Sequence, residues 1–152
     1  TKLSSLLNMA APMSSTSKSP VSSAQVAVNV NGQRTDIHCS VFTDQLYVIV
    51  TQFCKLGTLV QVKPETVVDE MEGTTPVLTA KVLFGNDEPL VHVISRRIAA
   101  SLKPSKPVLL ALSLKDTSRE AVFPLLPAIQ SCVARAQGGN SAQPVREEVL
   151  VR

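Results

Sequence analysis

The stretch that most constrains the fold spans residues 46–53, which carry apolar side chains on both faces of a predicted strand. Successive side chains of a pleated strand point to opposite faces. The two sets here are Leu46, Val48 and Val50 against Tyr47, Ile49 and Phe53. A strand with one face in water alternates apolar and polar residues, and this one does not. Both of its faces must therefore be covered. Residues 108–114 repeat the pattern.

The length and composition are those of one globular domain. A chain of 152 residues can bury a core of its own. Aromatic residues make up 3% of the chain and the net charge is +3, whereas nucleic-acid binding uses aromatic stacking and strong positive charge. No apolar run approaches the ~20 residues of a membrane helix, and the N-terminus lacks the apolar core of a signal peptide. We therefore expect neither a nucleic-acid nor a membrane partner.

The cysteines and histidines form no catalytic or metal-binding motif. Cys39, Cys54 and Cys132 lie far apart, which is typical of reduced thiols in a cytosolic or nuclear protein. A pairing of Cys39 or Cys54 with His92 is the one nucleophile–base arrangement that the sequence leaves open. Neither His38 nor His92 has metal-ligand spacing to another ligand type. We therefore expect no enzyme activity, no metal and no cofactor.

The first half of the domain is predicted to be all strand. Five strands are expected, at residues 25–30, 33–42, 46–53, 58–63 and 76–84. Asn31 and Gly32 join the first two, and this dipeptide is a strong hairpin signal because both residues tolerate a positive φ. The first four strands are predicted to form an antiparallel meander. Residues 64–75 are predicted to be a mobile acidic loop.

Two helices and a sixth strand are predicted in the second half. Asp87 can cap the first helix, with His92 on its outer side, and Pro104 stops it. The sixth strand is expected at residues 108–114. The second helix is expected to begin at a capping box that starts at Thr117.

Two prolines disturb this second helix. Pro124 and Pro127 conflict with a straight helix because each removes a backbone donor. Two alternatives follow: the helix starts late, or it is bent.

These elements predict an α+β fold, with a six-stranded, mainly antiparallel sheet and two helices in the order βββββαβα. The domain is expected to cover residues 24–137, between a disordered lead-in at 1–23 and a flexible tail at 138–152. Two helices cover about one face of such a sheet, which leaves the other face for a partner. The sequence allows dimerisation through either the sheet or the helix faces.

Two long runs give the chain a family resemblance. Residues 50–60 (VTQFCKLGTLV) and 76–90 (PVLTAKVLFGNDEPL) resemble the proteasome assembly chaperone 3 family, and the likeness covers about residues 24–137. The resemblance implies a small α+β protein that dimerises with a relative, proteasome assembly chaperone 4, or with itself. It also implies a chaperone that scaffolds the α-ring of the 20S proteasome, contacts its α-subunits and is no protease. Pro124 and Pro127 depart from the unbroken helix that the family pattern implies.

Client contact is expected in loops and on a helix face, because function often lies on loops held by a rigid scaffold. The candidates are Lys55, Leu56, Asp69, Glu70, Glu72, Arg96 and Arg97. The other reading for the two arginines is a solvated helix face.

A non-catalytic assembly chaperone in the cytoplasm, and as a second option also in the nucleus, is therefore the leading hypothesis. The alternative is a generic dimeric α+β scaffold module of trafficking or signalling type with another client. A small cysteine-dependent enzyme is the third class. Co-purifying α-subunits would separate the first two, and thiol reactivity would test the third.

Overall fold

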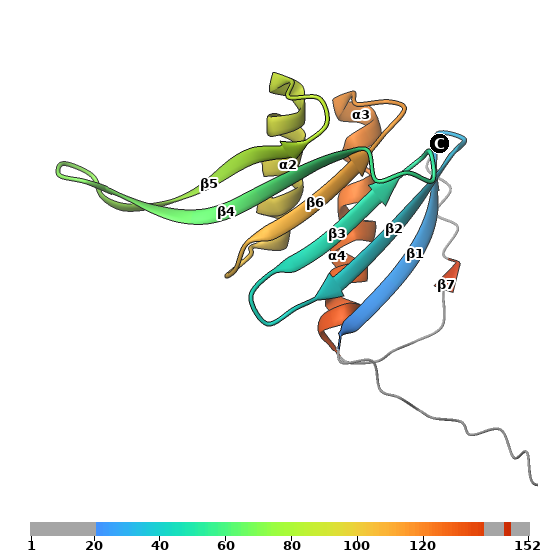
Figure 1. Ribbon diagram of the computed structural model, residues 1–152, viewed down its shortest axis with the longest axis horizontal. Helices are drawn as coiled ribbons and strands as arrows, with labels where there is room; N and C mark the ends of the chain where they lie inside the picture. The colour runs from blue at the N-terminus through green and yellow to red at the C-terminus, as the bar shows by residue number, and fades with distance from the viewer. Residues whose placement is uncertain (1–20, 139–144, 147–152) are drawn as a thin grey trace, which may run out of the picture.

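The computed structural model describes residues 21–138 and 145–146, and it shows one twisted sheet with helices along one side (Figure 1). The long strands are β1 Ser22–Val30, β2 Gln33–Val41, β3 Leu46–Thr51, β4 Thr58–Asp69, β5 Gly73–Phe84 and β6 Val108–Ser113. The helices are α2 Pro89–Leu102, α3 Arg119–Val122 and α4 Leu125–Gln137, and β7 is the two-residue strand Val145–Arg146. The predicted fold class, with its order of six strands and two long helices, is confirmed.

The strands are ordered β5-β4-β6-β3-β2-β1-β7 across the sheet. The strands β1, β2 and β3 form an antiparallel meander as predicted, but β4 does not continue it. Instead β6 lies between β3 and β4, parallel to β3 and antiparallel to β4. The predicted four-strand meander is therefore wrong. The observed order has a physical reason. Because β3 and β6 both lack a polar face, they pair with each other in the middle of the sheet, where neighbouring strands flank both of them.

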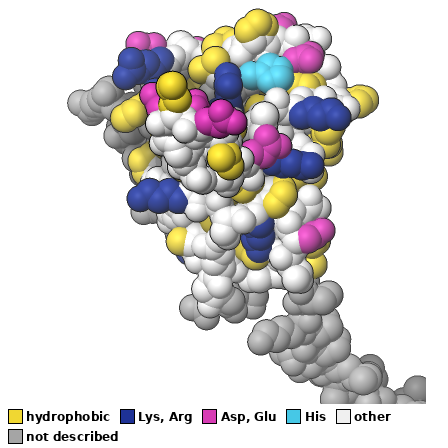
Figure 2. Space-filling model, turned by 90° about the vertical axis from the view of Figure 1, so that its left-hand side faces the viewer, with side chains coloured by type: hydrophobic (Ala, Val, Ile, Leu, Met, Phe, Trp, Pro, Cys, Tyr) yellow, Lys and Arg dark blue, Asp and Glu magenta, His cyan; other side chains and the backbone are white. Residues whose placement is uncertain are grey.

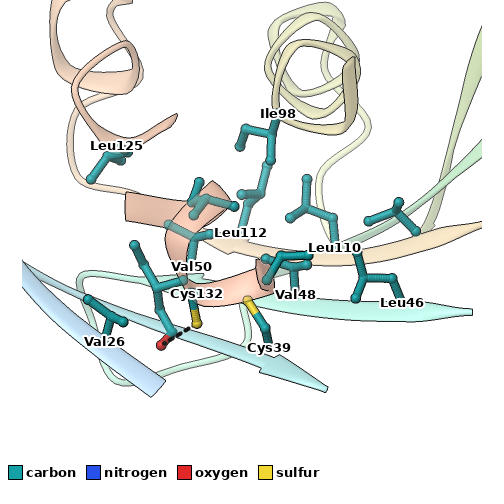
Figure 3. Packing of buried hydrophobic residues seen from close by; sticks show 14 of the residues in the cluster. Val26, Cys39, Leu46, Val48, Val50, Ile98, Leu110, Leu112, Leu125 and Cys132 are labelled. Atoms are coloured by element: carbon teal, nitrogen blue, oxygen red, sulfur yellow. Dashed lines mark hydrogen bonds between the residues drawn. The ribbon is translucent and has the colours of Figure 1, made fainter. Parts of the chain in front are cut away.

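The core lies between the sheet and the two long helices, which cover the same face (Figure 1). Strands β3 and β6 contribute Leu46, Val48, Val50, Leu110 and Leu112 to it, and the helices contribute Ile98, Leu125 and Cys132 (Figure 3). Ile129 of α4 belongs to the same cluster. Val48 and Val50 have no exposed surface. The set of β3 side chains headed by Leu46 therefore faces the helices, a choice that the sequence left open.

Two turns contain a glycine with a positive φ, a backbone conformation that other residues rarely adopt. Asn31 and Gly32 have φ values of 51° and 77°, so the predicted tight hairpin between β1 and β2 is confirmed. Gly57 has a φ of 66°, and a Cβ placed there would lie 2.1 Å from the carbonyl oxygen of Leu112. The loop after β3 must therefore pass directly against the backbone of β6 to reach β4 on its other side.

The start of α2 differs from the prediction in its cap. Pro89 occupies the first turn as expected, but the N-cap position is Glu88, and its side chain forms no capping bond. Asp87 instead accepts a hydrogen bond from Nε2 of His92 at 2.5 Å. His92 is half-buried rather than on the outer side, because its Nδ1 also bonds the carbonyl oxygen of Ala80 in β5 at 3.2 Å. This bridge fixes the first turns of α2 against β5.

The two prolines divide the last helical segment in two. Ser118, not Thr117, caps α3 and accepts a bond from the backbone nitrogen of Ala121 at 3.3 Å. Pro124 is the N-cap of α4, and Pro127 lies in its first turn, where a missing N–H leaves no intrahelical bond unmade. Of the two alternatives, a late start of the main helix is what the structure shows.

The predicted lead-in and tail fall mostly outside the described residues. Strand β1 already begins at Ser22, before the expected boundary. Within the predicted tail, residues 145–146 form β7, which pairs in parallel with Val26 and Ala27 of β1. The six predicted strands therefore gain a short seventh at the β1 edge.

Candidate functional site

The sheet face opposite the helices has an apolar centre. Cross-strand partners share a face, and the register places Tyr47 beside Leu109, and Ile49 and Leu59 on either side of Ala111. Tyr47, Ile49, Leu59 and Leu109 are only partly buried, whereas neighbours on the helix side of the same strands, such as Val48, Val60 and Leu110, have no exposed surface. We call Tyr47, Ile49, Leu59, Leu109 and Ala111 the open-face cluster.

Polar side chains surround this cluster. His38 lies directly across from Ile49 and Ser40 across from Tyr47, and Nε2 of His38 lies 3.1 Å from Oγ of Ser40. On the other side, Gln61 of β4 is the partner of Leu109. An apolar centre with a polar rim is the composition of a protein–protein interface. Both long helices lie on the other side of the sheet (Figure 1).

The predicted mobile loop at residues 64–75 is instead part of a long β-hairpin. Pairing between β4 and β5 continues from Leu59 to Asp69 and Gly73, whereas β4 pairs with β6 only as far as Val62. Beyond that point the two strands form a free ribbon that projects from the sheet (Figure 1), which we call the arm. The prediction was wrong because the acidic residues drew attention away from the β-branched residues at 66–68 and 74–75, which suit a strand.

The arm carries acidic and apolar side chains together. No Lys or Arg occurs between Pro64 and Ala80. Its acidic residues are Glu65, Asp69, Glu70 and Glu72. Val68 is 75% exposed and Met71 at the tip is 96% exposed. Figure 2 views the molecule from the side toward which the arm projects, and it shows acidic, basic and apolar side chains interspersed.

The loop that holds Lys55 and Leu56 forms a second exposed group at one end of the sheet. Leu56 is 55% exposed and Phe53 46%. The Nζ atoms of Lys55 and Lys115 lie 5.8 and 5.3 Å from the centre of the Phe53 ring, within cation–π range. The backbone nitrogen of Lys115 also donates to the side chain of Gln52 at 2.7 Å. We call Phe53, Lys55, Leu56 and Lys115 the basic loop cluster.

Sequence reasoning missed Phe53 and Lys115 as members of this cluster. Lys115 follows β6, and the parallel pairing brings the ends of β3 and β6 together at Thr51 and Ser113. The predicted meander placed β4 there instead. The signal that could have revealed the contact was the matching apolarity of the two strands.

The seven predicted client-binding residues are exposed but occupy three separate places. Lys55 and Leu56 lie in the basic loop cluster, and the three acidic residues lie at the tip of the arm. Arg96 and Arg97 lie on the outer side of α2, where Nε of Arg96 donates to the carbonyl oxygen of His92 at 3.3 Å. The structure therefore does not join them into one site.

Two of the cysteines belong to the core rather than to an accessible reactive site. Cys39 and Cys132 are buried, and their sulfur atoms lie close together in the core (Figure 3). The hydrogen bond to Cys132, together with burial, raises the pKa of the Cys39 thiol well above its usual range. A thiol with a raised pKa is a poor nucleophile. The described residues contain no group of three or more His, Cys, Asp or Glu side chains placed to hold a metal ion.

Thiol labelling should distinguish the three cysteines. Cys54 is exposed, whereas Cys39 and Cys132 are buried. We expect a disulfide reagent such as Ellman's to modify Cys54 alone in the folded protein and all three thiols after denaturation. The folded Cys54→Ser variant should therefore lack the thiol that reacts rapidly with the reagent. Equally fast labelling of Cys39 or Cys132 would contradict this packing.

In the described part of the chain, no helix is long and apolar enough to cross a membrane.

Sequence comparison finds similarity to one family. The model of the family "Proteasome assembly chaperone 3" matches residues 48–132. Proteins named proteasome assembly chaperone 3 from Bos taurus and Homo sapiens are 43% and 40% identical over 115 residues, which cover 74% of this chain and 93% of each relative. The protein of that name from Nematostella vectensis is 36% identical over 115 residues, covering 70% of this chain and 85% of its own.

A solved structure has a similar fold. It is described as a novel chaperone complex for yeast 20S proteasome assembly. One of its chains matches with a TM-score of 0.51 and 14% sequence identity, over 75% of this chain and 97% of that chain. At this identity the likeness concerns the fold alone.

Proposed function

The chain belongs to the proteasome assembly chaperone 3 family, and we propose that it is a non-catalytic chaperone that, as a dimer, scaffolds assembly of the 20S proteasome α-ring. Family membership supports the activity, because its relatives are named for it at about 40% identity. The open-face cluster is the observation that carries the dimer. It offers an apolar surface at the centre of the sheet that no element of the described chain covers.

The energy of covering the open face sets how much of it a dimer must bury. Covering each large aliphatic side chain contributes roughly 1.5–3 kcal/mol if burial is complete. Tyr47, Ile49, Leu59 and Leu109 are partly exposed on each subunit, so two packed faces offset an association cost of about 4–15 kcal/mol only if most of this surface is buried. The proposed partner is a proteasome assembly chaperone 4-like protein, or a second copy of this chain.

The proposed client is a proteasome α-subunit, bound by surfaces that the dimer leaves free. The arm presents Asp69, Glu70 and Glu72 away from the sheet, and the basic loop cluster presents Lys55 and Leu56 at one end of it. Charged groups at an exposed rim speed encounter with a partner of opposite charge and fix its orientation. Free cysteines support the cytoplasm, with the nucleus as a second compartment, as the proposed location.

Charge reversal at the arm tests client contact. In the variant with Asp69→Lys, Glu70→Lys and Glu72→Lys, we expect weaker binding of α-subunits. We expect a nearly unchanged melting temperature, because these side chains are exposed. Co-purification of immature α-subunits and thermal unfolding provide the two measurements. Asp44→Lys, in the exposed turn before β3, is the control for a change of charge.

Two outcomes would count against the proposal. A loss of stability as large as the loss of binding would show that the arm residues are structural. If the unaltered protein co-purifies with trafficking or signalling proteins and with no α-subunit, the generic scaffold is the better account.

A further inference from the structure

A shallow groove follows the N-terminal half of α2, between this helix and the chain that joins β6 to α3. It consists of two hollows, of about 270 and 200 Å³, whose linings share Ile94 and Thr117. The larger one ends against β6 and is lined partly by polar groups such as Asn86 and Glu88. The smaller one is lined by apolar side chains and two arginines: Leu90, Val93, Ile94, Val122, Arg97 and Arg119, with Thr117.

Two apolar side chains of the smaller hollow are accessible, whereas Ile94 and Val122 beside them are buried. Leu90 is 45% exposed and Val93 53% exposed. Leu90, Val93 and Arg97 follow one another at spacings of three and four residues, so they form a stripe on one side of α2. Phe123, next to Val122 on the facing segment, is 58% exposed. The groove therefore has an apolar floor that the described chain leaves open.

The charge of the smaller hollow is positive. No Asp or Glu lines it. Neither Arg97 nor Arg119 has a carboxylate partner among the described residues; the ion pairs that two described residues form with each other are Arg34 with Asp36 and His92 with Asp87. A guanidinium group presents a planar fork of donors that matches a carboxylate. Both arginines can therefore accept an acidic group from another molecule.

We infer that this groove binds an acidic and aliphatic segment of the client α-subunit, in which carboxylates flank aliphatic side chains. This inference rests on the proposed function, since it adds a third client-binding surface to the arm and the basic loop cluster. The aliphatic groups would pack on Leu90 and Val93, and the carboxylates would meet Arg97 and Arg119. Each hollow is smaller than the roughly 300–1,000 Å³ of small-molecule sites, which favours side chains of a protein segment over a free ligand.

The inference separates two residues that are neighbours in the sequence. Arg97 lines the groove, whereas Arg96 does not and donates instead to the carbonyl oxygen of His92. Reversing the charge at either position changes the net charge by the same amount. Arg96→Glu is therefore a matched control for Arg97→Glu, and it carries half of the charge change of the Arg97→Glu, Arg119→Glu variant.

The test measures binding of purified α-subunits, each offered separately to the full-length chain together with its dimer partner. For the α-subunit that the unaltered protein binds, the Arg97→Glu, Arg119→Glu variant should raise Kd about tenfold or more, since two ion pairs become two repulsions. The Leu90→Ser, Val93→Ser variant should also weaken binding. Arg96→Glu should leave Kd within about twofold, the scale of a screened surface charge.

Each of the other outcomes overturns the inference in a distinguishable way. An unchanged Kd in the double arginine variant excludes the groove. An equal loss with Arg96→Glu indicates a general effect of charge rather than a built site. A change in oligomeric state of the arginine variant assigns the groove to contacts between copies of this chain. If no α-subunit binds the unaltered protein, the proposed function fails, and the client site fails with it.

Discussion

Replacing Val50 with aspartate is expected to prevent folding. Val50 has no exposed surface and packs in the layer between β3 and the helices (Figure 3). The change removes about 1.5–3 kcal/mol of apolar burial and leaves an unpaired charge in the core, which costs several kcal/mol more. A domain of this size has a free energy of unfolding of about 5–15 kcal/mol in all. The two losses together are of that magnitude.

Circular dichroism and thermal unfolding would check this expectation. The Val50→Asp protein should lack native helix and strand signals, or accumulate as insoluble aggregate. Val50→Ala is the matched control: it loses volume without adding a charge, so it should fold and melt at a lower temperature. A Val50→Asp protein that melts cooperatively near the unaltered temperature would contradict the assignment of this face to the core.

Replacing the adjacent Ile49 with aspartate is expected to preserve the fold and disrupt the dimer. Ile49 points to the open face, where a carboxylate in the monomer stays in contact with water and lies across from His38. In the dimer the same carboxylate would be buried at the centre of the interface. An effective penalty of ~3 kcal/mol or more corresponds to a rise of at least about a hundredfold in the dimer dissociation constant.

The measurement for this variant combines circular dichroism with size-exclusion chromatography and light scattering. We expect a native spectrum and the mass of one chain at concentrations where the unaltered protein is a dimer. Ile49→Val keeps the surface apolar and should remain a dimer. If Ile49→Asp were folded and dimeric with unchanged affinity, the interface would have to lie elsewhere, and the helix faces would be the next candidates.

The contrast between Val50 and Ile49 shows how much of the fold the sequence predicts. The alternation in residues 46–53 correctly separates two sets of side chains. It does not say which set faces the helices, because both sets are apolar. That choice depends on the helices α2 and α4, whose apolar stripes join β3 in one core cluster only in the tertiary structure.

Pairing between distant strands is what the sequence does not reveal. Residues 46–53 and 58–63 are close in the chain and look like consecutive strands of a meander. Nothing local indicates that β6, some sixty positions later, enters between them in parallel. The basic loop cluster depends on this crossover, because Lys115 reaches Phe53 only through it. The matching apolarity of the two strands was the available signal for this pairing, and local patterns alone therefore did not predict the composition of the cluster.

The arm and the start of α2 show a second limit, in which a local signal has two uses. Acidic residues at 64–75 suggest a loop, yet Val67, Val68, Thr74 and Thr75 also fit a strand, and pairing between β4 and β5 decides the matter. Asp87 has the chemistry of a helix cap, but in the folded chain its carboxylate accepts a hydrogen bond from Nε2 of His92 instead. In both cases contacts made in the folded chain override a local preference.

Sedimentation equilibrium at micromolar concentration, on the full chain alone and mixed with a proteasome assembly chaperone 4-like partner, tests the central claim most directly. That claim is that the open-face cluster around Tyr47, Ile49 and Leu109 is covered by a second subunit. We expect the mass of two chains in at least one of the two samples, and the mass of one chain for Ile49→Asp in both. A single chain in both samples of the unaltered protein would contradict it.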